Sequence, residues 1–197
     1  MKLLLSGTKL KILEGALNIL ECKGIQSLTQ PAVAKLVGIP QGQLTYHFKK
    51  RADLVNAVAH ATLDAMADAV FRKEFQGVSE GKELGPFLKL LQGFLKMKSR
   101  ARALFGLMLE ADENPDVKAK VLEQGARVRG LIATVARIEE NDPLVAMYHS
   151  LLLGYGLQYF LVDDKAHRAK LDADFEANFR AMNGLLQARG KRTRKGK

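Results

Sequence analysis

Hydrophobic residues recur every three or four positions along most of the chain, which predicts α-helices rather than strands. In the first segment Leu13, Ala16, Leu17 and Leu20 mark one apolar face, and Gly24 can end the helix in the left-handed region. Later segments predict helices over about 29–37, 40–48, 52–75, 86–98, 100–112, 115–140, 143–162 and 165–188, with a loop over 77–85. The predicted fold is all-α, with about nine helices.

Helix-start signals support this division. Thr29 is a good N-cap residue, and Pro31 is tolerated in the first helical turn because its missing amide hydrogen would have no partner there. The pairs Asn114-Pro115 and Asp142-Pro143 repeat a cap-and-proline pattern before two longer apolar segments.

Residues 29–48 have the organisation of a helix-turn-helix, with Gly38 in the turn between two short helices. The small side chain of Ala34 permits close packing, and Leu44 and Phe48, four residues apart, can anchor the second of these helices. In such motifs the N-terminal residues of the second helix reach base edges in the major groove. We therefore expect Gln41, Gly42 and Gln43 to lie at the bases, with paired contacts to adenine from the glutamines and room for close approach at Gly42.

The charge distribution favours a polyanionic partner. The net charge is +10; residues 1–53 hold eight Lys and Arg against three Asp and Glu, and residues 188–197 hold six basic residues and no acid. A basic module near the helix-turn-helix is typical of nucleic-acid binding. Side chains suited to phosphate contacts follow the base-reading positions, namely Thr45, Tyr46, His47, Lys49, Lys50 and Arg51.

Residues 11–55 resemble the N-terminal domain of TetR-family transcriptional regulators. The resemblance rests on Gly24, Thr29, Val33-Ala34, Gly38, Leu44, His47-Phe48 and Asp53-Leu54. It implies a cytoplasmic homodimer that represses from a palindromic double-stranded DNA operator and is released by a small-molecule effector. It also implies base readers at Gln41 and Gln43, and phosphate contacts from Thr29, Tyr46, His47 and Arg51. The chain departs from the family at Thr45, where tyrosine is common, and at Pro40, where a hydroxyl cap is common.

The remainder of the chain predicts a larger helical domain. We expect a DNA-binding domain over 1–51, a ligand-binding and dimerisation domain over 52–188, and a disordered basic tail over 189–197. Adaptable apolar residues and polar-tipped aromatic residues in the larger domain are the candidate effector site: Met66, Phe94, Met97, Phe105, Met108, Tyr148, His149 and Tyr155. For each methionine or phenylalanine alone, core filling is the alternative.

The last two predicted helices are the candidate dimer contact. Residues 143–162 carry no Lys, Arg, Asp or Glu, and the final helix has a single apolar stripe, so two helices from each subunit can form a four-helix interface. Burial within one subunit is the alternative. Because His149, Ser150 and Gln158 interrupt the uncharged segment, we expect it to be buried in protein and not in a membrane.

No sequence pattern indicates an enzyme. The chain has no nucleotide-binding glycine motif, no metalloprotease motif and no Cys/His cluster, so we expect no cofactor and no metal. The single cysteine, Cys22, fits a reducing compartment. A ligand-independent architectural DNA-binding protein is the alternative function, although it would not need a large near-neutral helical domain.

Overall fold

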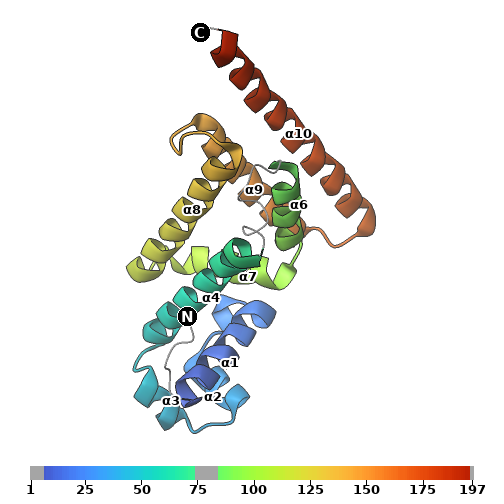
Figure 1. Ribbon diagram of the computed structural model, residues 1–197. Coiled ribbons are helices and arrows are strands. Elements are labelled where there is room, and N and C mark those ends of the chain that lie inside the picture. Colours follow the sequence, from blue (N-terminus) through green and yellow to red (C-terminus); the bar gives the residue numbers. More distant parts are fainter. Residues whose placement is uncertain (1–6, 74–83, 196–197) are drawn as a thin grey trace. The chain divides into compact units, whose positions relative to one another are not determined.

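The all-α prediction is confirmed. The computed structural model describes the backbone of residues 7–73 and 84–195, and within these ranges it contains nine α-helices, one 3-10 helix and no strand (Figure 1). Side chains are described for 7–66, 89 and 91–186. The helices are α1 (Gly7–Lys23), η1 (Ile25–Ser27), α2 (Gln30–Val37), α3 (Gln41–His47), α4 (Arg51–Lys73), α6 (Leu84–Leu95), α7 (Lys98–Glu110), α8 (Pro115–Ala136), α9 (Pro143–Leu161) and α10 (Lys165–Lys195).

The chain forms two compact units. The first comprises Met1–Ala69 and Arg102–Gly125, and the second comprises Val70–Ala101 and Ala126–Lys197. Residues 52–69 and 102–125 thus group with the three N-terminal helices, although the sequence assigned them to the ligand-binding domain. The functional division near residue 51 stays a prediction.

Local chemistry explains the three N-terminal helices. Gly24 and Gly38 have φ values of 86° and 67°, in the left-handed region that glycine enters without strain, and they follow α1 and α2. The Thr29 hydroxyl accepts a hydrogen bond from the Ala32 amide at 3.3 Å and caps α2 as predicted. Gly15 allows α1 to approach α2, because a Cβ there would lie 2.3 Å from Val37 Cγ1.

The buried face of α1 differs by one position from the predicted one. Ile12 and Ile19 are buried along with Ala16 and Leu20, whereas Leu13 and Leu17 are half-buried. The apolar residues of α1 cover more than one face, and α1 packs against both η1 and α2. Residues that flank the predicted stripe therefore enter the core.

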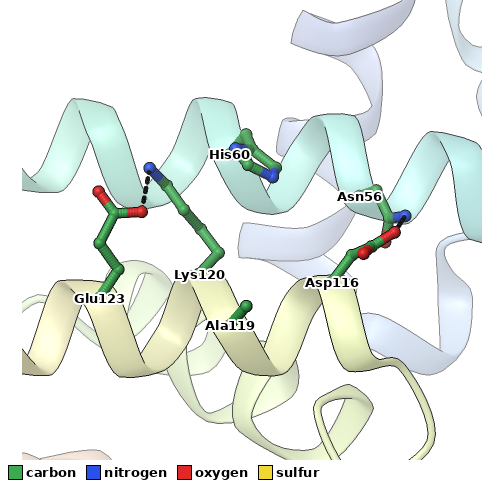
Figure 2. A pocket seen from close by; sticks show the side chains of 6 residues that line it. All are labelled: Asn56, His60, Asp116, Ala119, Lys120 and Glu123. Atoms are coloured by element: carbon green, nitrogen blue, oxygen red, sulfur yellow. Dashed lines mark hydrogen bonds and ion pairs between the residues drawn. The ribbon is translucent and has the colours of Figure 1, made fainter.

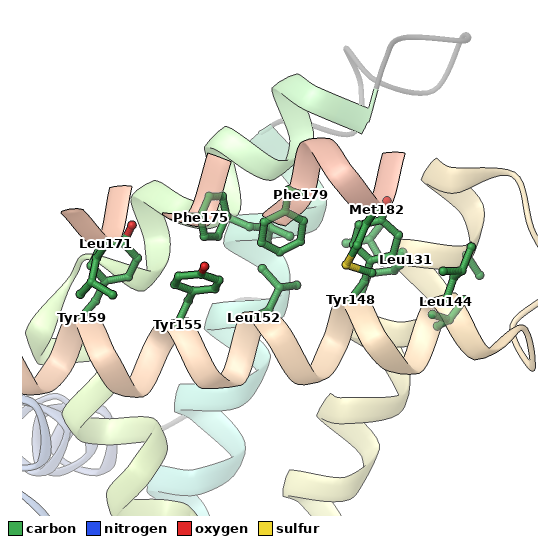
Figure 3. Packing of buried hydrophobic residues seen from close by; sticks show 14 residues of the cluster. Leu131, Leu144, Tyr148, Leu152, Tyr155, Tyr159, Leu171, Phe175, Phe179 and Met182 are labelled. Atoms are coloured by element: carbon green, nitrogen blue, oxygen red, sulfur yellow. The ribbon is translucent and has the colours of Figure 1, made fainter. Parts of the chain in front are cut away.

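Aromatic side chains form the core of the second unit. In Figure 3, Tyr148, Tyr155 and Tyr159 of α9 face Phe175 and Phe179 of α10. The Phe175 and Phe179 ring centroids lie 4.3 Å apart, and those of Tyr155 and Phe175 lie 5.1 Å apart at 72°. Leu171 and Met182 complete the predicted stripe of α10, and α6 also packs on α9. One face of the uncharged helix is thus buried within the chain.

Two helix ends differ from prediction. The helix expected to reach residue 140 ends at Ala136, and Arg137 follows it with φ 56°, in the left-handed region. The backbone of α10 continues to Lys195, although an irregular tail was predicted from residue 189. The segment has no proline to end the helix, and its Lys and Arg residues are good helix formers that offset the unfavourable Gly190 and Thr193. Most of the predicted loop over 77–85 lies outside the described residues, and α6 begins at Leu84. Among the described helices, none has both the length and the apolar character that crossing a membrane requires.

Candidate DNA-binding and effector sites

Helix α3 presents one polar edge and one buried edge. Gln41, Gly42 and Gln43 are all exposed, whereas Leu44 and Phe48 are buried and anchor the helix to α1 and α2 as the sequence predicted. Pro40 occupies the N-cap position without a side-chain hydrogen bond, so α3 begins at Gln41. The side chains of the first turn are therefore free of any capping role and available to an outside partner.

Gly42 has no packing reason within the described residues. A Cβ built at this position meets no atom within 4 Å, and the backbone is helical. Since glycine is less favourable in a helix than alanine, the fold itself gives no explanation for it. A surface that approaches α3 closely from outside would explain it.

The residues that follow extend the exposed surface. The Tyr46 side chain is 83% exposed, and its ring meets the half-buried His47 ring edge-on at 5.3 Å. Lys49 and Lys50 are also exposed. The Thr45 hydroxyl donates to the Gln41 carbonyl at 3.0 Å, so its hydrogen is committed to the helix, and a phosphate contact from Thr45 would have to replace that bond.

Arg51 has an internal role that the sequence did not reveal. Its two terminal nitrogens donate to the two carboxylate oxygens of Glu110, at 2.8 and 3.0 Å. Its Nε donates to the Leu28 carbonyl at 3.1 Å, and Nη2 also donates to the Ile25 carbonyl at 3.3 Å. We therefore leave Arg51 out of the phosphate-binding set.

The predicted effector residues do not all belong to one unit. Met66, Phe105 and Met108 belong to the first unit, and Phe94, Met97, Tyr148, His149 and Tyr155 belong to the second. Their exposure also varies: Met66, Tyr148 and Tyr155 are buried, Phe94, Phe105, Met108 and His149 are half-buried, and Met97 is 47% exposed. The Phe94 ring lies 4.7 Å from the Arg100 guanidinium.

Polar partners already engage the tyrosines of α9. The Tyr148 hydroxyl donates to Asn183 Oδ1 at 2.8 Å, and Tyr155 accepts from Asn178 Nδ2 at 2.6 Å. Burial raises the pKa of Tyr148 to about 12, so its hydroxyl stays neutral and can donate. Burial, followed by the nearby Arg129 charge, lowers the pKa of His149, which favours the neutral imidazole at pH 7.

A polar groove lies between α4 and α8 in the first unit. Figure 2 shows its lining residues Asn56, His60, Asp116, Ala119, Lys120 and Glu123. The Lys120 side chain is 7% exposed, and its ammonium contacts Asp64 at 2.7 Å and Glu123 at 3.1 Å. Burial acts to lower the pKa of Lys120, but hydrogen bonds to the two carboxylates outweigh it and the pKa is raised. No sequence pattern indicates this groove, because its residues come from two helices about 60 positions apart.

Two buried polar atoms of the first unit have no hydrogen-bond partner. They are the hydroxyl of Thr62 on α4, a residue only 3% exposed, and the Oε1 atom of Gln124 on α8. No group of three or more His, Cys, Asp or Glu residues within the described ranges could hold a metal ion.

Comparisons with known proteins place the DNA-binding helices in a family. Residues 12–58 match the family model described as bacterial regulatory proteins, tetR family. No curated protein matches the chain. The fold is similar to a putative transcriptional regulator from Saccharomonospora viridis in complex with choline, at TM-score 0.71 and 18% identity, covering 88% of this chain and 98% of that one.

Two further structures have a similar fold. One is a putative TetR-family transcriptional regulator from Mesorhizobium loti, at TM-score 0.71 and 16% identity over 92% of this chain and 98% of that one. The other is the multidrug binding protein EbrR complexed with malachite green, at TM-score 0.68 and 21% identity over 89% and 98%. The match over residues 12–58 thus identifies a TetR-family helix-turn-helix domain at the N-terminus, and the similar structures show that the chain as a whole has the fold of these regulators.

Proposed function

We propose that the protein is a homodimeric, cytoplasmic repressor that binds a palindromic operator and is released from it by a small-molecule ligand. The observation that carries the DNA-binding part is the exposed first turn of α3, where Gln41 and Gln43 flank a glycine that no packing contact requires. Glutamine can form paired hydrogen bonds to adenine in the major groove. Tyr46, Lys49 and Lys50 extend this surface toward phosphates, with Thr29, His47 and Thr45 as further candidates.

Homodimerisation is supported by the outward faces of α9 and α10. On α9, Met147, Gly154, Leu157 and Leu161 are exposed at helical spacing, and Leu161 is 66% exposed. Gly184 on α10, like Gly154, has no atom within 4 Å of a Cβ built on it. An exposed apolar stripe with room for close helix approach is suited to the predicted four-helix interface with a second copy.

A small-molecule effector is supported by the solved structures of similar fold that hold choline or malachite green. In this chain, the unpartnered Thr62 hydroxyl and Gln124 Oε1 favour a ligand that carries hydrogen-bonding groups. The test is to measure operator affinity and thermal unfolding with choline, malachite green and a wider compound panel. A compound that raises Tm and weakens operator binding supports release, whereas compounds that raise Tm without changing operator affinity contradict it.

The DNA-binding proposal is tested by selecting bound sequences from a random duplex pool at near-physiological salt. We expect one palindromic motif, and we expect Gln41→Ala and Gln43→Ala to relax its base preference at one position per half-site. Gln26→Ala is the matched control, because Gln26 is an exposed glutamine on η1 and outside α3. Broad binding without a motif would instead support the architectural alternative.

A further inference from the structure

One face of α7 contacts α1, η1 and the first residue of α4 through three residues at four-residue intervals. Arg102, Gly106 and Glu110 lie on one side of the helix because this spacing is close to one helical turn. All three belong to the first unit, together with α1, α2 and α3. Each makes a different kind of contact.

The contacts begin at the end of α1. Arg102 Nη1 donates to the Glu21 carbonyl at 2.6 Å and to the Cys22 carbonyl at 3.3 Å, so it satisfies oxygens of the last helical turn. Gly106 lies against η1, because a Cβ there would be 3.1 Å from Ile25 Cβ. The third residue, Glu110, holds Arg51 in a two-pronged ion pair.

Hydrogen bonds and the short chain segment 28–30 together connect Glu110 to the recognition helix α3. Besides its ion pair with Glu110, Arg51 donates to the carbonyls of Ile25 and Leu28, immediately before the α2 cap at Thr29. The Gln30 side-chain amide then donates to the Phe48 carbonyl at the end of α3. The position of α3 is therefore tied to α7 through Arg51.

The chemistry of the pair favours a positioning role. A guanidinium has a planar fork with five donors, which can serve one carboxylate and two carbonyls at the same time, and an ammonium has no such geometry. Glu110 is 16% exposed and Arg51 is 40% exposed at the side chain, so the pair is partly shielded from solvent.

We propose that Arg51 and Glu110 are positioning residues for operator recognition, which set the pose of α3 from α7 without contacting DNA themselves. The inference rests on the proposed DNA-binding function. Because a repressor dimer must place two recognition helices at a fixed separation, loosening this contact would reduce the discrimination between operators of different half-site spacing.

The test compares Glu110→Gln with Asp116→Asn in the full-length protein. Both variants remove one negative charge from the first unit, and Asp116 accepts a hydrogen bond from Asn56 on the α4–α8 groove, away from α1, α2 and α3. Operator affinity is measured by fluorescence anisotropy at fixed salt, on the selected operator and on operators with one base pair added to or removed from the spacer. Thermal unfolding is followed in parallel to confirm that each variant is folded.

We expect Glu110→Gln to weaken operator binding about tenfold and to flatten the spacing preference, with Asp116→Asn within about twofold of wild type. Arg51→Lys should behave like Glu110→Gln, and the double variant should add little to either single change. Equal operator affinity and spacing preference in folded Glu110→Gln and Asp116→Asn would overturn the inference. If wild-type protein binds no operator at all, the proposed function fails instead, before any variant is compared.

Discussion

Alanine is predicted to change the free energy of unfolding in opposite directions at two glycines, Gly15 on α1 and Gly42 on α3. At Gly42 the new methyl group meets no atom of the chain, so the expected effect is the gain in helix propensity, about 0.5–1 kcal/mol. At Gly15 it would lie 2.3 Å from Val37 Cγ1, inside normal contact, and valine is stiff about χ1. Overpacking of this kind costs about 1–3 kcal/mol, which we expect to exceed the propensity gain.

For Gly42→Ala we expect operator affinity to fall although stability rises. If the first turn of α3 enters the major groove, a methyl group at its centre obstructs close approach and operator affinity should fall about tenfold, corresponding to about 1.4 kcal/mol. Gly42→Ala should therefore be more stable yet bind operator more weakly, while Gly15→Ala should lose stability.

Thermal unfolding followed by circular dichroism and operator binding by anisotropy measure both quantities on the same samples. Anisotropy is recorded well below the Tm of both variants, so that unfolding does not enter the affinity. A Gly42→Ala protein that is stabilised and binds operator as tightly as wild type would refute the assignment of this edge of α3 to DNA.

Further substitutions test other parts of the structure. Asp172 accepts hydrogen bonds from Lys96 and Tyr159. Burial acts to raise the pKa of Asp172, but these contacts outweigh burial and the pKa is lowered. The stabilising contribution of Asp172 is therefore present above the unfolded pKa and lost as the pH falls through the folded pKa. Asp172→Asn should therefore be less stable than wild type at pH 7 in urea unfolding, and a difference that persists below pH 2 would contradict this. Thr62→Val removes a buried hydroxyl without a partner and should raise stability by about 1 kcal/mol in the same assay; a loss of stability would show that the hydroxyl has a partner. Leu157→Arg places a charge on the exposed face of α9 and should convert the proposed dimer to a monomer in light scattering, which an unchanged mass would refute. Deleting residues 189–197 removes six positive charges and should reduce the salt dependence of DNA binding; an unchanged slope would show that this segment does not contact phosphates.

Helices α1, α2 and α3 could be predicted from sequence because the residues that start, end and anchor them act locally. The Thr29 cap, the left-handed glycines at positions 24 and 38, and the anchors Leu44 and Phe48 each act within a few residues of the chain. Hydrophobic periodicity also predicted the remaining helices and the buried stripe of α10. It could not predict the burial of Lys120, because the Asp64 carboxylate that pairs with Lys120 lies on another helix.

Arg51 illustrates the limit of such local reasoning. Directly after two lysines it has the sequence context of a phosphate ligand, and its true partner Glu110 lies 59 residues away. Arg51 is the first residue of α4, whereas Lys49 and Lys50 lie in the bend before this helix and are exposed. The effector site was harder still to predict, since methionine and phenylalanine are equally common as core filling and as pocket lining.

The helical glycines fall into two groups, those that a close contact within the chain requires and those with open space around them. Gly15 and Gly106 are required by close contacts within the first unit, and alanine at either would have to displace a neighbour. Gly42, Gly93, Gly154 and Gly184 lie in helices with open space around them, where alanine would be the better helix former. Three of these four glycines lie beside other exposed residues on a proposed contact surface: Gly42 beside Gln41 and Gln43, Gly154 near Leu157, and Gly184 beside Leu185. At these three positions the unfavourable helix propensity and the exposed neighbours favour the same proposed partners, DNA for the first and a second copy of the chain for the others.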